Sequence, residues 1–195
     1  MRRHAVPSAT RNPFTAVLLA GGRSTRMGCD KAGLLLDGVP LWQRQLATLQ
    51  ALAPDELLIS GRLDGPFADA GIPIIADDVP GLGPLGGLAT ILRRMKCERV
   101  LLLAVDLPAM TAAFLESLLP ADGVVPFLDE HFEPLAAIYP RRVLPLAERC
   151  LAESDHSMQH FIRQCVAEGL LTPQPLRAAD RPIFRNANTP RDLRA

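Results

Sequence analysis

Residues 100–105 (VLLLAV) limit the fold most strongly, because six successive residues are apolar. A short strand without polar alternation is typical of a parallel sheet, which helices cover on both faces. Residues 16–20 form a second apolar run, which ends at Gly21 and Gly22. We therefore predict two buried strands, with residues 100–105 at the centre of the sheet.

Segments with helical spacing alternate with short strands along the rest of the chain. The predicted helices cover residues 41–52, 85–95, 111–119, 142–151 and 158–168, and a last helix starts at Thr189 and Pro190. The other predicted strands cover residues 56–60, 72–76, 124–127, 135–139 and 183–185. Thr111 is a predicted helix cap, and Asp155 or Ser157 caps the helix at 158–168. This alternation predicts an α/β, Rossmann-like, doubly wound and mostly parallel sheet.

The 195 residues suit a single domain, and no repeat or linker divides them. We assign residues 14–195 to this domain and residues 1–13 to a flexible leader. Ligands of such sheets sit at the carboxyl ends of the strands. The residues that follow positions 20, 60, 76 and 105 are therefore the first candidates for a site.

The formal net charge is zero, so no overall field favours nucleic acid or an anionic membrane surface. No apolar stretch reaches the length of a membrane span. The cysteines form no CxxC pair and match no zinc pattern; they are Cys29, Cys97, Cys150 and Cys165. We expect reduced thiols in a cytoplasmic protein that binds neither nucleic acid nor membrane.

The loop after the first predicted strand is rich in glycine and positively charged (GGRSTRMGCDK). Gly21 and Gly22 allow backbone N–H groups to approach phosphate oxygens, and Arg26 and Lys31 add charge. Lys31 is one of 2 lysines in a chain with 19 arginines, which favours a compact ammonium at this position. The loop is not a Walker A sequence. Phosphate binding is the functional interpretation, and a surface turn with incidental charges is the alternative.

Acidic and amide side chains follow other predicted strands. Asp106 comes directly after residues 100–105, where a carboxylate suits Mg2+, although it can also cap a turn. Asp77 and Asp78 follow residues 72–76, and we expect one of the two to be only solvated. Asn186 and Asn188 share one side of an extended segment. They can recognise a polar heterocycle or a phosphate, or can form a turn.

Six motifs occur in order between residues 16 and 193: LAGG–RMG–DK, IIADD, GPLGGL, LLLAVDLP, EPLAAIYP and NANTP. Together they resemble those of nucleotidyltransferases with a GT-A-like fold, and most closely those of molybdenum cofactor guanylyltransferases. The resemblance implies that the terminal phosphate of molybdopterin attacks the α-phosphorus of GTP and that pyrophosphate leaves. It implies Mg2+ as cofactor, GTP and molybdopterin as partners, and transient contact with cofactor-biosynthesis proteins or acceptor molybdoenzymes.

The same resemblance implies roles for single positions. Arg26, Lys31 and Asp106 would be catalytic, and Asp106 would also be the Mg2+ ligand. Asn186 and Asn188 would lie on the molybdopterin side of the cleft. The implied nucleotide-binding residues are Leu19, Ala20, Gly21, Gly22, Lys31, Ser60, Asp77 and Asp106.

One position departs from the family pattern, which can carry asparagine where this chain has Ser60. Base or ribose contact at Ser60 is therefore the open point of the resemblance. The LAGG sequence favours guanine over the cytosine of relatives that read LAAG. Three alternatives stay open: a molybdopterin cytidylyltransferase, another small-molecule nucleotidyltransferase of this fold, and a non-catalytic nucleotide-binding module.

Overall fold

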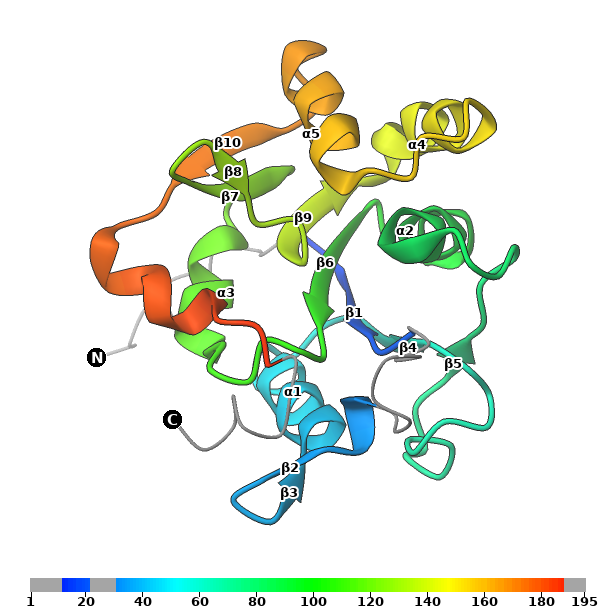
Figure 1. The fold of residues 1–195 in the computed structure, drawn as a ribbon, viewed down its shortest axis with the longest axis vertical. Helices are drawn as coiled ribbons and strands as arrows, with labels where there is room; N and C mark the ends of the chain where they lie inside the picture. Colours follow the sequence, from blue (N-terminus) through cyan, green and yellow to red (C-terminus); the bar gives the residue numbers. More distant parts are fainter. Residues whose placement is uncertain (1–11, 22–30, 188–195) are drawn as a thin grey trace, which may run out of the picture.

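The computed structural model describes residues 12–21 and 31–187. In these residues, eight strands form one twisted sheet with the order β10-β7-β9-β6-β1-β4-β5, and β8 pairs with β7 (Figure 1). The strands are β1 (Thr15–Leu19), β4 (Glu56–Ser60), β5 (Ile74–Ile75), β6 (Arg99–Ala104), β7 (Val124–Leu128), β8 (His131–Phe132), β9 (Ala136–Pro140) and β10 (Thr172–Pro175). A separate two-stranded ribbon pairs β2 (Leu35–Leu36) with β3 (Val39–Pro40).

The strands β6, β1, β4 and β5 run parallel, and β10 runs parallel to β7. Strand β9 is antiparallel to both β6 and β7. The expected α/β, mostly parallel sheet is therefore confirmed. Leu19 at the end of β1 pairs with Ser60 on one side and Ala104 on the other. The central strands thus end together at one edge of the sheet.

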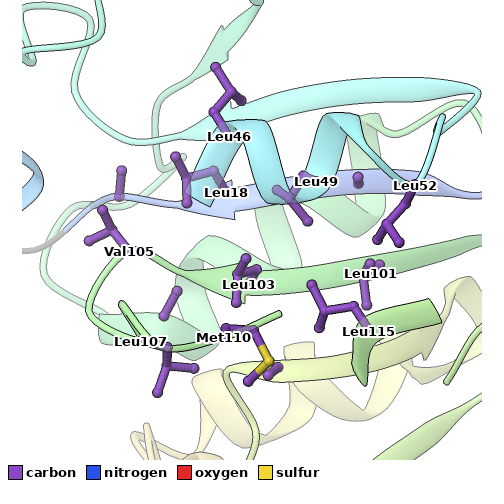
Figure 2. Close-up of a cluster of buried hydrophobic side chains, with 14 of the residues drawn as sticks. Leu18, Leu46, Leu49, Leu52, Leu101, Leu103, Val105, Leu107, Met110 and Leu115 are labelled. Atoms are coloured by element: carbon purple, nitrogen blue, oxygen red, sulfur yellow. The ribbon is translucent and has the colours of Figure 1, made fainter. Parts of the chain in front are cut away.

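Helices cover both faces of the sheet (Figure 1). Leu18, Leu101 and Leu103 face one apolar cluster with α1 and α3, while Val17 and Leu102 face a second cluster with α2, α4 and α5. Figure 2 shows part of the first cluster, between α1 and the central strands. This division explains why residues 100–105 lack polar alternation. The helices are α1 (Leu41–Gln50), α2 (Gly83–Arg94), α3 (Ala112–Leu118), α4 (Leu144–Ala152) and α5 (Met158–Ala167).

Both predicted helix caps have an identified partner. The Thr111 hydroxyl accepts a hydrogen bond from the Phe114 backbone N–H at the start of α3. At the start of α5 the cap is Ser157, whose hydroxyl accepts from His160, while Asp155 accepts from the Ser157 N–H. These bonds satisfy N–H groups that have no partner inside the helix.

The strand predicted at residues 183–185 is wrong. The segment Ala178–Phe184 forms a 3-10 helix, η3, and the side chain of Asp180 accepts hydrogen bonds from the Arg177 backbone and guanidinium at its start. Phe184 is buried by an edge-to-face contact with Phe114, with ring centroids 5.2 Å apart, rather than by strand pairing. The short strands β8 and β10 were not predicted, and the helix predicted from Thr189 lies outside the described residues.

Candidate functional site

The carboxyl edge of the sheet is where the predicted site residues gather. Ala20 and Gly21 follow β1, Ser60 ends β4, and Asp106 lies two residues beyond β6. The order of the sheet places β4 on one side of β1 and β6 on the other, so the chain leaves this point in two directions. A crevice at such a switch point is the usual ligand site of an open α/β sheet.

Lys31 and Asp106 meet at this edge. Lys31 opens the 3-10 turn η1 (Lys31–Gly33), and its Nζ lies 3.7 Å from Oδ2 of Asp106. Their side chains are 28% and 20% exposed, respectively. The loops after β1 and β6 therefore bring opposite charges together in a half-buried position.

The Asp106 carboxylate is incompletely satisfied by the protein. Burial raises the pKa of this carboxyl above its ordinary value, and the positive charge of Lys31 opposes that shift. Oδ1 of Asp106 is buried and has no hydrogen-bond partner among residues 12–21 and 31–187. An orphaned carboxylate oxygen is costly, and a hard cation is the ligand that such an oxygen suits. The residue present therefore fits a magnesium ion.

Metal binding here would rely on few protein ligands. The described residues contain no group of three or more histidine, cysteine, aspartate or glutamate side chains that could hold a metal ion. Mg2+ commonly keeps several waters and binds through one or two carboxylates plus substrate phosphates. A single aspartate beside Lys31 matches that type of site better than a closed structural metal centre.

A pocket of about 470 Å³ lies at the same edge of the sheet, and its lining includes residues from the loops after β1, β4 and β5. The lining residues described are Gly21, Gly61, Arg62, Ala76, Asp77, Pro80 and Gly81. Burial, and then the charge of Asp78, raise the pKa of the Asp77 carboxyl. A polar carboxylate in a cleft of this size is able to accept hydrogen bonds from a heterocycle or a ribose.

Ser60 and Asp77 both lie against Gly87 of α2. A Cβ atom added at Gly87 would lie 3.3 Å from Oγ of Ser60, 3.4 Å from Oδ1 of Asp77 and 3.0 Å from Cδ1 of Leu19. The absence of a side chain at Gly87 thus lets these groups pack closely on the helix. Ser60 itself is buried.

Two predicted backbone contacts are already engaged in the sheet. The carbonyl of Leu19 accepts a hydrogen bond from the Val105 N–H at 3.1 Å. The Ala20 N–H donates to the Ser60 carbonyl at 2.8 Å. These bonds fix the end of β1 beside the pocket, and contact of Leu19 or Ala20 with a nucleotide stays a prediction.

The C-terminal asparagine segment reaches the same edge. The Ala187 N–H donates to the backbone carbonyl of Asp106 at 2.8 Å, and the neighbouring Asn186 is exposed. This bond brings Asn186 close to the Lys31–Asp106 pair. Gly22, Arg26 and Asn188 lie outside the described residues, so their predicted roles stay predictions.

Two further residues border the site and were not predicted from the sequence. Arg62 lines the pocket directly after β4. Gln45 is buried on α1, and its Nε2 donates to the carbonyl of Leu107, next to Asp106. The sequence does contain a signal for Gln45, because it is a polar residue on the same helix face as the apolar residues Leu46 and Leu49.

Asp78 corrects the expectation that one aspartate of the pair is only solvated. Its carboxylate forms ion pairs with Arg93, at 3.0 Å, and with Arg94. Both arginines lie on α2, and nothing in the sequence pattern indicates that they contact the loop after β5.

Two further predictions concern the thiols and the helices. Cys97, Cys150 and Cys165 are free thiols, as their spacing predicts, and Cys29 lies outside the described residues. Burial is the main cause that raises the pKa of Cys165 to about 12. None of the helices in the described part of the chain has the length and apolar character needed to cross a membrane.

Known proteins resemble this chain over most of its length. A protein from Opitutus terrae, named "Probable molybdenum cofactor guanylyltransferase", is 35% identical over 192 residues, which cover 95% of each chain. A molybdenum cofactor guanylyltransferase from Xanthomonas euvesicatoria is 34% identical over 91% of each chain. The solved structure of molybdopterin-guanine dinucleotide biosynthesis protein A from Archaeoglobus fulgidus has a TM-score of 0.72 and 24% identity, and covers 92% of this chain and 95% of its own.

The model of one protein family spans most of the sheet and its helices, since it matches residues 16–169. The matched region holds β1, β4, β5 and β6, and therefore Lys31, Asp77 and Asp106. The chain belongs to the family of MobA-like NTP transferase domains.

Proposed function

We propose that this protein transfers GMP from GTP to the terminal phosphate of molybdopterin or molybdenum cofactor. The observation that carries the proposal is the Lys31–Asp106 pair, with Nζ and Oδ2 3.7 Å apart at the carboxyl edge of the sheet. Membership in the MobA-like NTP transferase family and full-length similarity to guanylyltransferases support it.

The reaction needs little acid–base chemistry from the protein. An oxygen of the acceptor phosphate forms a bond to the α-phosphorus of GTP, and the bond between that phosphorus and the bridging oxygen to the β-phosphate breaks. Pyrophosphate leaves with the electron pair. The acceptor phosphate is already an anionic nucleophile, so positioning and charge neutralisation supply most of the rate acceleration.

Lys31 would bind a non-bridging oxygen of the triphosphate, because its ammonium stands beside the crevice at the end of β1. Charge neutralisation there favours the transition state, in which negative charge grows on the departing pyrophosphate. Arg26 would add a second positive charge from the same loop.

Asp106 would hold Mg2+ through its carboxylate, one oxygen of which is buried and lacks a hydrogen-bond partner in the described part of the chain. When bound, Mg2+ would neutralise phosphate charge and orient the triphosphate. Asn186, held near Asp106 by the Ala187 backbone bond, would contact the molybdopterin side of the cleft together with Asn188.

The nucleoside would occupy the pocket near Asp77. Its carboxylate is an acceptor for the N1–H and 2-amino donors of guanine, a pair that cytosine does not present. Ser60 offers a short hydroxyl beside Asp77 and no amide, so Asp77 would carry the larger part of the base contact.

Pyrophosphate release with purified protein, Mg2+ and molybdopterin tests the proposal, with GTP, CTP, ATP and UTP compared side by side. We expect release with GTP and a loss of release without Mg2+. Release with CTP alone would instead support a cytidylyltransferase. Nucleotide binding without release in any reaction would support a non-catalytic module or another acceptor.

A further inference from the structure

Neighbouring aspartates at the end of β5 face different surroundings. Asp77 lines the pocket, whereas the carboxylate of Asp78 pairs with Arg93 and Arg94 on α2. Arg93 also bonds Glu148 of α4 at 2.9 Å, so its guanidinium is fixed from two sides. The Asp78 side chain is therefore an anchor to the helix.

Thr90 holds the backbone of the same residue. Its buried hydroxyl accepts a hydrogen bond from the Asp78 N–H at 3.1 Å and donates one to the Gly86 carbonyl at 3.0 Å. A hydroxyl is the group that fills both roles at once. Gly87, three residues before Thr90 on α2, is the position against which the Asp77 carboxylate lies.

The loop after Asp78 has little packing beneath it. Val79 is 54% exposed, and Gly81 has a φ of 89°, in the left-handed region. A second cavity of about 310 Å³ lies under the loop, and its lining includes Asp78, Thr90 and Arg93. The hydrogen bond and ion pairs of Asp78 therefore contribute much of the interaction that keeps the loop in place.

We infer that Thr90 and Asp78 are positioning residues that set the place of Asp77 in the nucleotide pocket. The inference rests on the proposed function, since it concerns the nucleotide side of the same site. Lys31 and Asp106 lie in the loops after β1 and β6, whereas the anchor joins the loop after β5 to α2. Loss of the anchor should weaken nucleotide binding and leave the chemical step intact.

The test uses Thr90→Val, which removes the hydroxyl at nearly constant shape, and Thr90→Ser, which keeps it. Thr48→Val is the matched control, because Thr48 also donates to the carbonyl four residues before it, Arg44 at 3.1 Å, but lies on α1. KM for the nucleotide, kcat, the dissociation constant measured by calorimetry without acceptor, and thermal unfolding are recorded for each.

We expect Thr90→Val to raise KM and the dissociation constant about tenfold, the size of one lost buried hydrogen bond, with kcat within about twofold of wild type. Thr90→Ser and Thr48→Val should stay close to wild type. Unchanged nucleotide affinity in Thr90→Val, or an equal loss in Thr48→Val, would overturn the inference.

Asp78→Ala is a second variant, should Thr90→Val fail to fold, because Asp78 lies at the surface. It should shift nucleotide affinity in the same direction, and unchanged affinity would overturn the inference. Absence of pyrophosphate release by the wild type would count against the proposed function alone, since calorimetry still reads the anchor. A wild type that binds no nucleotide would overturn both.

Discussion

A charged side chain lies at each end of β6, and the protein satisfies the hydrogen-bonding capacity of the two to very different extents. At its start, Arg99 is 2% exposed, and its guanidinium donates to the carbonyls of Asn12, Leu119 and Ala121, each at 2.6 Å. Beyond its end, Asp106 has one carboxylate oxygen 3.7 Å from Lys31 Nζ. Its other oxygen is buried and has no hydrogen-bond partner among the residues that the structure describes.

The difference indicates a structural role for Arg99 and makes Asp106 the candidate for ligand binding. Multiple carbonyls replace the water that the Arg99 guanidinium lost on folding, so its burial holds elements together. Asp106 is left with an unfavourable environment that a bound cation or ligand would correct. A protein tolerates such a residue where the chemistry requires it.

The largest effect is expected from Asp106→Ala. Removal of the carboxylate should lower kcat about a thousandfold, because Mg2+ and the triphosphate would lose their protein ligand. The circular dichroism spectrum should match that of the wild type. Turnover within about tenfold of wild type would contradict a metal-binding role.

Arg99→Met should have the next largest effect, and on stability rather than turnover. Four backbone carbonyls lose a donor, so the free energy of unfolding should fall by about 3 kcal/mol in denaturant titration. Arg142→Met is the matched control, because Arg142 is half exposed and pairs with Asp122. The free energy of unfolding of Arg142→Met should stay within about 1 kcal/mol of wild type. An equal loss in both variants would show that the buried arginine contributes no more to stability than an exposed one.

Lys31→Ala sharpens the comparison at the functional end. We expect kcat/KM for the nucleotide to fall about a hundredfold, because the triphosphate loses one fixed positive charge. Lys31→Arg should recover only part of the loss, since a planar guanidinium does not replace a compact ammonium. Unchanged kinetic constants in Lys31→Ala would contradict a role of Lys31 in binding the triphosphate.

The smallest effect concerns pH. Burial raises the pKa of Asp106 in the folded state above the ordinary value of 3.8, so the folded state holds this proton more tightly than the unfolded state. Stability is then lost as the pH rises from 3.8 through the folded pKa, and the penalty persists above it. Asp106→Asn should therefore be more stable than wild type by about 1 kcal/mol at pH 7, with the gain shrinking toward pH 4.

Denaturant titrations of both proteins between pH 4 and pH 8 measure this difference. A gain that is constant with pH would show that packing, and not the carboxylate charge, is responsible.

The sequence predicted the central strands and the Lys31–Asp106 edge because both depend on local pattern. Strand β4 was predicted with the bounds that the structure has, and Asp106 was placed directly after the central strand. Contacts between distant segments were not predictable in the same way. Nothing in the sequence around Arg99 indicates carbonyls 20 residues away, and nothing near Asp78 indicates Thr90.

The wrong strand at residues 183–185 has a similar cause. An apolar pair between polar residues is compatible with a strand, but the choice depends on whether a sheet edge is within reach. Phe184 instead packs on Phe114 of α3. The choice of nucleotide base could not be predicted for a related reason. Ser60, Asp77 and Gly87 are far apart in the sequence and come together only when the chain folds.

The fate of the α-phosphate tests the central claim most directly. GTP labelled at the α-phosphate, or separately at the γ-phosphate, is incubated with molybdopterin, Mg2+ and either wild-type protein or Asp106→Asn. For the wild type we expect α-label in a molybdopterin dinucleotide and γ-label in pyrophosphate, with both strongly reduced in the variant. Label from the γ-phosphate released as inorganic phosphate, or equal transfer by Asp106→Asn, would contradict it.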